Sequence, residues 1–277
     1  MNTATPAVPR AHRTAPQPFG EHLRHWRQRR RLSQLDLAQE AEISTRHLSF
    51  VETGRASPSR EMVLRLSERL DIPLRERNAL LVAAGFAPMY RERALDDPAL
   101  AAARKAVELV LKGHEPCPAL AVDRHWNMVA ANAAVPHLLA GVDPSLVQAP
   151  VNVLRLSLHP AGLAPKIANL GQWRTHLFER LRQQVNATGD AVLADLLEEL
   201  RGYPLPDGAT DLKLEGELLG VAMPFRFRTD TGVLNFISTT TVFGTPVDVT
   251  LQELAVESFF PADEFTAQAL RALMDRG

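Results

Sequence analysis

Two short stretches near residues 33 and 44 carry hydroxyl, amide and guanidinium groups that could bind phosphates and base edges. Ser33 is a favoured N-cap residue, and Asp36 three positions later completes a box-like helix start. The free backbone N–H groups and positive dipole of such a start attract phosphate. We therefore interpret Ser33 and Gln34 as residues that position the chain on a nucleic-acid backbone.

The second helix start presents side chains suited to base recognition. The candidates are Ser44, which caps the helix, and Thr45, Arg46, Ser49 and Phe50 on its outer side. Arginine can donate two hydrogen bonds to guanine, so we expect Arg46 to specify sequence. Phe50 departs from a polar face and either contacts a thymine methyl group or covers the core.

These side chains need two helices and a tight turn to position them. The period from Phe19 to Ala84 is helical, with five short apolar stripes, and predicts an all-α helix-turn-helix unit. Its inward-facing residues are predicted as Leu35, Leu37, Ala38 and Ala41 before the turn at 42–44, and Leu48 and Val51 after it. Arg55 and Arg60 flank the next loop and suit phosphate contacts, with a solvated charged face as the alternative.

Residues 19–84 resemble the lambda-repressor/XRE class of five-helix DNA-binding domains. The motifs that carry this likeness are Ser33-Gln34, Leu37-Ala38, Ile43-Ser44 and Glu52-Thr53-Gly54-Arg55. The resemblance implies a structural salt bridge between Arg27 and Glu52. The run Arg29-Arg30-Arg31 is either a basic patch near the DNA or a solvated helix end. Arg10 and Arg13 on the N-terminal arm are further candidates, for the minor groove.

The rest of the chain mixes strands and helices. Residues 118–134 predict a strand, a turn at 123–125, a second strand and a short helix from about Asn132. Residues 165–201 have helical spacing. The period then changes to two and predicts strands at 212–220, 221–229, 232–243 and 247–256, followed by a helix from about Ala262.

This order of elements resembles a PAS-like sensory domain with a helical insertion, and the chain is similar to XRE regulators that carry a MmyB-like ligand-binding domain. The segments with the likeness are 124–134, 152–160, 169–177 and 241–263. The resemblance implies a small, mainly apolar ligand, with fatty acid as one precedent, in a pocket between the sheet and the inserted helices.

Candidate ligand-binding residues follow from their chemistry. The apolar candidates are Leu154, Phe225, Phe227 and Phe236, and the polar or amphipathic ones are Arg155, His159, Trp173, Arg174 and His176. A carboxylate or phosphate head group would favour the arginines. The alternative is that the phenylalanines are core residues and that Arg174 pairs with a carboxylate such as Glu179.

Length, charge and the order of elements predict an α+β chain with two domains of different function. The 277 residues are 45 % hydrophobic, which suits two domains. Residues 1–95 hold 16 Lys and Arg against 10 Asp and Glu, whereas the remainder has an acidic excess. We expect a disordered arm at 1–18, a DNA-binding domain at 19–85, a linker with a connecting helix at 86–112, and a PAS-like domain at 113–277.

Several classes of function lack their sequence signals. Cys117 is the lone cysteine, the nine histidines have no metal-ligand spacing, and the phosphate-loop, zincin and nucleophile-elbow motifs are missing. No apolar run is long enough to span a membrane, and residues 1–18 have no signal-peptide core. We therefore expect a cytoplasmic protein that is not an enzyme and needs no cofactor or metal.

The sequence thus predicts a transcription regulator that binds double-stranded DNA and senses a small molecule. One short recognition helix covers few base pairs, so a homodimer on a near-palindromic operator is expected. The alternative is a DNA-bound assembly factor whose C-terminal domain only docks proteins or dimerises.

Overall fold

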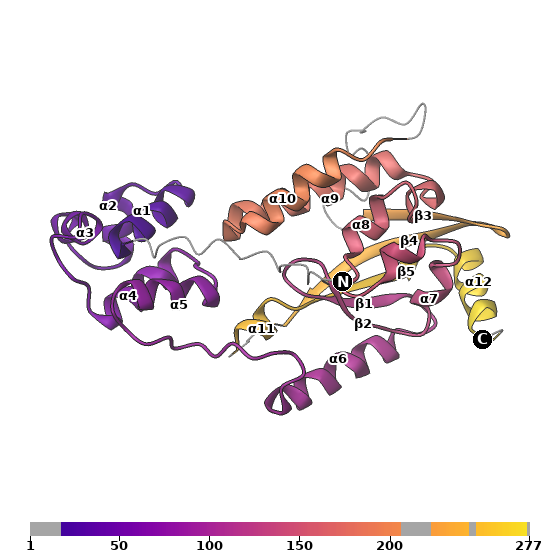
Figure 1. Ribbon diagram of the computed structural model, residues 1–277, viewed down its shortest axis with the longest axis horizontal. Helices are drawn as coiled ribbons and strands as arrows, with labels where there is room; N and C mark the ends of the chain where they lie inside the picture. Colours follow the sequence, from indigo (N-terminus) through magenta and orange to yellow (C-terminus); the bar gives the residue numbers. More distant parts are fainter. Residues whose placement is uncertain (1–17, 206–222, 244–247, 276–277) are drawn as a thin grey trace, which may run out of the picture. The chain divides into compact units, whose positions relative to one another are not determined.

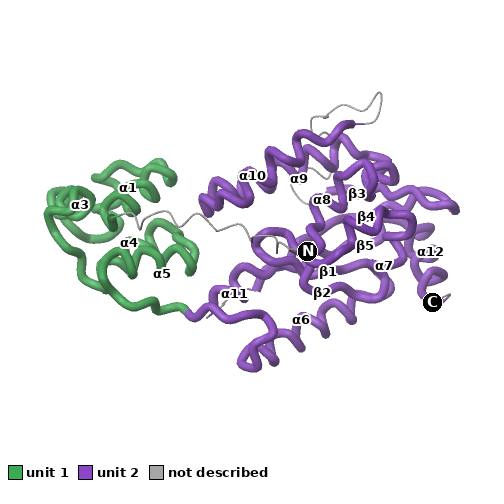
Figure 2. The backbone as a smooth tube through the Cα atoms, viewed as in Figure 1, with its two compact units in different colours: residues 1–90 green, residues 91–277 purple. Residues whose placement is uncertain are grey.

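The computed structural model describes residues 18–205, 223–243 and 248–275. The chain divides into two compact units, residues 1–90 and 91–277, which Figure 2 shows in green and purple. Each unit has a hydrophobic core of its own. Arg10, Arg13 and the predicted strand at 212–220 lie outside the described residues.

The described part of the first unit is built from short helices, three of which begin at serine caps. Figure 1 labels them α1 (Phe19–Arg29), α2 (Gln34–Glu40), α3 (Thr45–Glu52), α4 (Arg60–Arg69) and α5 (Leu74–Ala83). Ser33, Ser44 and Ser59 each accept a hydrogen bond from the backbone N–H three residues later, at 3.1–3.2 Å. The predicted helix-turn-helix is confirmed, with α2 and α3 as its two helices.

The core of the first unit takes one apolar stripe from each helix. Its largest fully buried side chains are Leu23, Trp26, Leu37, Leu48, Leu66, Leu70, Ile72, Leu80 and Leu81. Leu35 is 54 % exposed, so its predicted place in the packing face is wrong. Residues two apart on a helix point about 200° away from each other, so Leu35 cannot share a face with Leu37.

The second unit contains one antiparallel sheet and several helices. Its strands are β1 (Ala119–Val122), β2 (Met128–Ala131), β3 (Met223–Thr229), β4 (Gly232–Val242) and β5 (Ala255–Pro261). Its helices are α6 (Ala101–Gly113), α7 (Val135–Leu138), α8 (Val153–Leu158), α9 (Leu170–Thr188), α10 (Ala191–Arg201), α11 (Val249–Gln252) and α12 (Glu264–Met274), with 3-10 turns η1 (Pro98–Leu100), η2 (Pro144–Val147) and η3 (Ala164–Lys166).

The sheet has the strand order β2-β1-β5-β4-β3, and all neighbouring pairs are antiparallel. The helices α7 to α10 enter between β2 and β3, which confirms the PAS-like α+β arrangement with a helical insertion. The inserted helices pack on one face of the sheet, and α6 packs on the other through Val107 and Leu111 (Figure 1).

Two predicted elements of the second unit differ from the structure. Residues 247–256 were expected to form one strand, but Asp248 accepts a hydrogen bond from the Thr250 backbone and starts the helical turn α11. The helix expected from Asn132 begins only at Val135. The Asn132 side chain instead bonds to backbone groups of Leu111, Cys117 and Ala119, which joins β1 to α6.

In the described ranges, the helices lack the combination of length and apolar character that a membrane crossing requires.

Candidate functional site

The predicted DNA-binding residues lie on α2, on α3 and around the loop to α4. Ser33, Ser44, Arg46, Arg55 and Arg60 are exposed, whereas Gln34, Thr45, Ser49 and Phe50 are partly buried. Leu48 and Val51 are buried on the inner side of α3. The helix α3 therefore has an inner side with Leu48, Val51 and the paired Glu52, and an outer side that is polar except for Phe50.

Phe50 supports Arg46 on the outer face of α3. The guanidinium of Arg46 lies over the Phe50 ring, 5.3 Å from its centroid, one helical turn away. The Phe50 carbonyl accepts hydrogen bonds from the backbone N–H groups of Arg55 and Ala56 at 2.8 and 3.1 Å. Phe50 thus orients one basic residue and holds the loop that carries another.

The start of α2 is held by bonds within the unit. Ser33 and Asp36 form a capping box, and the hydrogen bonds from Ser33 lower the pKa of the Asp36 carboxyl. The Gln34 amide donates to Glu52 at 2.8 Å. The first intrahelical bond is donated by Leu37, and the Asp36 N–H already donates to Ser33 Oγ, so the backbone N–H groups of Gln34 and Leu35 are the ones that face the helix start, where a phosphate can accept their hydrogen bonds.

A buried ion pair fastens α1 to α3, as the resemblance implied. Arg27 donates to both carboxylate oxygens of Glu52, at 2.6 and 2.9 Å, and also to the Leu32 carbonyl. The two backbones are close here, because a Cβ on Gly20 would lie 2.4 Å from the Glu52 carbonyl oxygen. This Arg27–Glu52 clamp sets the position of the recognition helix.

The basic run at the end of α1 has mixed roles. Arg30 donates to the carbonyls of Leu70 and Asp71, at 2.7 and 2.8 Å, and so caps the end of α4. Arg29 and Arg30 both lie against the Trp26 ring. Arg31 is exposed. The run is mainly a set of helix contacts, with one side chain left to solvent.

The second unit holds an apolar cavity between the sheet and the inserted helices. It is lined by Pro118, Leu120, Trp126, Met128, Val135, Leu138, Leu139, Val153, Leu154, Leu156, Ser157, Leu163, Trp173, Leu177, Phe225, Phe227, Glu257 and Phe259. Its volume of about 90 Å³ is several times the 10–15 Å³ that one water needs. Such a cavity can accept an apolar chain.

One wall of the cavity carries a buried acid. Arg180 donates to both carboxylate oxygens of Glu257, at 3.0 and 2.7 Å, and Thr240 donates to one of them at 3.0 Å. The Arg180 guanidinium also lies 4.6 Å from the centre of the Trp126 ring. This Arg180–Glu257 pair joins α9 to β5.

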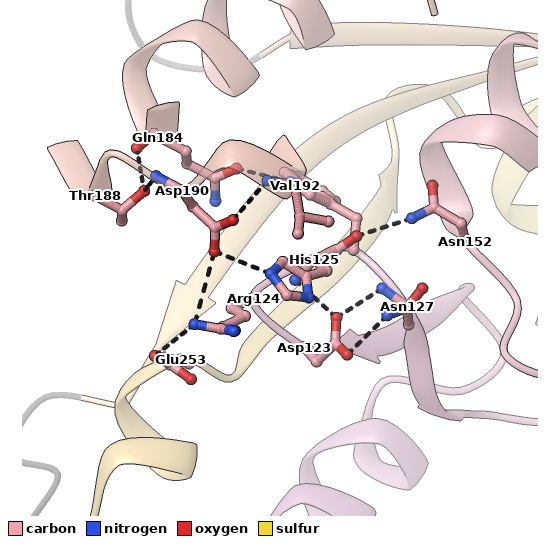
Figure 3. Close-up of polar contacts among 11 residues, drawn as sticks. Asp123, Arg124, His125, Asn127, Asn152, Gln184, Thr188, Asp190, Val192 and Glu253 are labelled. Carbon is pink, nitrogen blue, oxygen red and sulfur yellow. Dashed lines mark hydrogen bonds and ion pairs between the residues drawn. The ribbon is translucent and has the colours of Figure 1, made fainter. Parts of the chain in front are cut away.

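A polar network holds Trp126 in the cavity wall. Asp123 accepts hydrogen bonds from the backbone N–H groups of His125 and Asn127 (Figure 3). Trp126, between these two residues, has the left-handed φ of 65°. His125 bonds to Asp190 at the start of α10, at 2.9 Å. The Trp126 indole donates to Gln184 at 2.7 Å. The turn before β2 is thereby fixed to the junction of α9 and α10.

Two family profiles match this chain. Residues 18–80 match a helix-turn-helix domain, and residues 103–273 match the MmyB-like transcription regulator ligand binding domain. The second match covers more than half of the chain. The chain belongs to the MmyB-like transcription regulator family. No curated protein matches it. The chain therefore combines a DNA-binding domain with a regulator's ligand-binding domain.

In this MmyB-like regulator, the cavity brings together four of the nine predicted ligand residues. These four are Leu154, Trp173, Phe225 and Phe227. Phe236 packs behind Phe225, with ring centroids 6.0 Å apart, and is core. The remaining four predicted residues are polar and lie outside the lining.

Each of these polar residues has a partner within the unit. Arg155 forms two hydrogen bonds to Glu199, at 2.8 and 2.7 Å. Arg174 donates to the carbonyls of Arg201 and Tyr203, at 2.9 Å each. His159 stacks edge-on against Tyr203, at 5.1 Å.

His176 adjoins the cavity from outside its lining. Its ring lies 5.7 Å from that of Trp173. Burial, and then the charge of Arg180, lower the pKa of His176.

The residues that sequence reasoning missed are Trp126, Arg180 and Glu257. The available signal for Glu257 was a carboxylate inside the apolar run Leu254–Pro261, which is unusual for a strand. Its partner Arg180 is 77 residues away and gave no local sign of the pairing. In the described ranges, no group of three or more His, Cys, Asp or Glu side chains could hold a metal ion.

Proposed function

We propose that this chain is a sequence-specific DNA-binding transcription regulator whose second unit binds a mainly apolar small molecule in the cavity. The observation that carries the proposal is the cavity itself. Its lining is apolar except for Ser157, Glu257 and the two indole N–H groups, and it lies in the domain that matches a ligand-binding family.

On DNA, we assign base recognition to the outer face of α3. Arg46, with Thr45 and Ser49 beside it, reads base edges in the major groove, and the Phe50 ring keeps the Arg46 guanidinium in place. Arg55 and Arg60 contact phosphates, as do Ser33, Ser44 and Gln34 at the two helix starts.

The regulator acts as a homodimer on a near-palindromic operator. The support for this is the shortness of the recognition helix, which has eight residues. Two such helices on successive turns of the major groove supply the affinity that one cannot. Sedimentation of the chain alone and with selected DNA tests this assembly.

The ligand has an aliphatic chain of the fatty-acid kind. The support is the lining, in which leucine and phenylalanine side chains from β3, α8 and α9 face one another. Burial of such a chain stabilises the complex by about 0.8 kcal/mol for each CH₂ group.

Native mass spectrometry of the freshly purified chain tests the ligand, alongside thermal unfolding with added apolar compounds. We expect an extra mass that is lost on denaturation, or a raised unfolding temperature with an added compound. A bare chain that no apolar compound stabilises contradicts the proposal and favours the protein-docking alternative.

Selection of bound duplexes from random DNA tests the first unit. We expect a recurring sequence whose symmetry reflects two recognition helices. Binding without any sequence preference contradicts the assignment of Arg46.

A further inference from the structure

Tyr90 ends the first unit and Arg91 begins the second, and each residue is held by hydrogen bonds within its own unit. In the first unit, the Asn78 side chain donates to the Tyr90 carbonyl at 2.6 Å and accepts from the Tyr90 backbone N–H at 3.0 Å. In the second unit, the Arg91 carbonyl accepts from the Val249 backbone N–H at 2.9 Å. The two held residues are adjacent, so a single peptide bond connects one set of hydrogen bonds to the other.

The second unit holds residues 91–93, which we call the strap, against the helical turn α11. Arg91 and Asp248 form an isolated parallel β-bridge. The Thr250 hydroxyl donates to the Arg93 carbonyl at 2.6 Å, and the Arg93 guanidinium donates to Asp248 at 3.0 Å. The Asp248 side chain is 1 % exposed, and its other oxygen accepts from the Thr250 backbone N–H. Asp248 thus both anchors the strap and starts the helical turn that the strap contacts.

The turn α11 leads directly into the wall of the cavity. Strand β5 follows α11 after two residues, and its residues Glu257 and Phe259 line the cavity. Glu253, the residue after α11, lies 3.9 Å from Arg124 in the turn between β1 and β2 (Figure 3). The same turn carries Trp126, another residue of the lining. Two parts of the cavity wall are therefore joined to the turn that holds the strap.

We propose that the strap transmits the state of the cavity to the DNA-binding unit, an inference that rests on the proposed function. A ligand that displaces β5 or the Trp126 turn also displaces α11, and with it the strap. The displacement passes to the first unit through the peptide bond after Tyr90, because the next residue along the chain is already part of the strap. Asp248, which lies outside the cavity lining, is the positioning residue of this connection.

Trypsin, which cleaves after arginine, tests how the strap is held. The carbonyls of the bonds after Arg91 and Arg93 are both hydrogen-bonded to α11, so the docked strap resists cleavage. Asp248→Asn keeps the capping oxygen but removes the acceptor of the Arg93 guanidinium. We expect it to speed cleavage at these two bonds at least about fivefold, measured by mass spectrometry of the fragments. Asp143→Asn is the matched control, because Asp143 caps a different short turn, η2, in the same way. Equal cleavage rates in the two variants overturn the anchoring role of Asp248.

DNA binding tests the transmission, with decanoate as the probe on the full chain. In the wild type and in Asp143→Asn, saturating decanoate should raise the unfolding temperature and change the affinity for the selected duplex at least about fivefold. In Asp248→Asn the rise in unfolding temperature should remain, while the change in affinity should fall below about twofold.

The outcomes separate this inference from the function on which it rests. A change in affinity in Asp248→Asn as large as that of the wild type overturns the inference and leaves the proposed function intact. A wild-type chain that decanoate stabilises without any change in DNA affinity also overturns the inference, because the strap then has nothing to transmit. A wild-type chain that decanoate does not stabilise contradicts the proposed ligand, and this inference with it.

An insertion decides the case if Asp248→Asn does not fold. Two glycines between Tyr90 and Arg91 should leave the hydrogen bonds of both residues in place, but they add about 7 Å of chain between the units. We expect decanoate to stabilise this variant as it stabilises the wild type, and to change its affinity for the selected duplex less than about twofold. A change as large as that of the wild type overturns transmission through the strap.

Discussion

The two units each contain a buried arginine–glutamate pair, and the two pairs are chemically alike. Glu52 accepts three hydrogen bonds, two from Arg27 and one from Gln34, and its side chain is 2 % exposed. Glu257 also accepts three, two from Arg180 and one from Thr240. Each pair joins elements that are far apart in the sequence.

The difference lies in what borders each carboxylate. Glu52 is enclosed by α1, α2 and α3, so its pair acts only as a clamp on the recognition helix. Glu257 borders an apolar cavity, so its pair also forms part of the wall of that cavity. The same chemical group is enclosed by helices in one unit and lines a cavity in the other, so the two pairs differ in their surroundings although their hydrogen bonds are alike.

Breaking the clamp of the first unit should give the largest effect. Glu52→Gln leaves the Arg27 charge buried without its counter-ion, which should lower the free energy of unfolding by about 3–5 kcal/mol. Urea unfolding followed by circular dichroism measures this loss. Glu199→Gln, in an exposed pair, is the control and should cost no more than about 1 kcal/mol. Equal losses in the two variants would show that the clamp has no special role.

Arg46 contrasts with the paired arginines Arg27 and Arg180. Its guanidinium is exposed and lies over the Phe50 ring. Arg46→Ala should relax preference at one base position of the selected DNA, at a cost of about 1–3 kcal/mol in binding. Arg55→Ala should instead weaken binding to all duplexes alike and reduce the salt dependence. Fluorescence anisotropy on selected and random duplexes measures both. Identical behaviour of the two variants would refute the assigned roles.

Acid should weaken both units through one partly buried histidine in each. Burial lowers the pKa of His22 in α1 and of His176 in α9 below the ordinary value of 6.5. The unfolded chain then binds protons first as the pH falls below 6.5, so stability is complete above that pH and declines below it. Urea unfolding at a series of pH values should show this decline, and His22→Asn or His176→Asn should each make it shallower. If neither variant changes the loss of stability at low pH, other titratable groups cause that loss.

The exposed leucine of α2 should give the smallest effect. Leu35→Gln removes an apolar side chain that already faces solvent, so stability should stay within about 0.5 kcal/mol of the wild type. Thermal unfolding measures this. A loss as large as that of a core leucine would show that Leu35 is covered by a partner in solution.

The first unit could be predicted almost completely from its sequence because its signals are local. The caps Ser33 and Ser44 and the stripe that includes Leu37 and Leu48 lie within a few residues of the elements that they define. The error at Leu35 came from counting apolar residues without their angle around the helix. The predicted DNA-binding residues Ser33, Ser44, Arg46, Arg55 and Arg60 are exposed, and their exposure could be expected without tertiary contacts.

The cavity was harder to predict because its polar groups are decided by distant partners. The apolar walls Phe225 and Phe227 followed from strand alternation. The partners of the arginines could not be predicted in this way, since Arg155 pairs with a glutamate 44 residues away and Arg180 pairs with one 77 residues away. A local sequence window shows that a charge is present, but only the fold shows whether that charge is already neutralised.

The most direct test of ligand-controlled DNA binding is an anisotropy titration of the selected duplex, with and without a saturating apolar compound that raises the unfolding temperature of the chain. We predict that this compound changes the affinity of the wild-type chain for the duplex by at least about fivefold, while the affinity for random DNA stays the same. The contradicting result is a complex with the compound, proven by the raised unfolding temperature, whose affinity for the selected duplex equals that of the free chain.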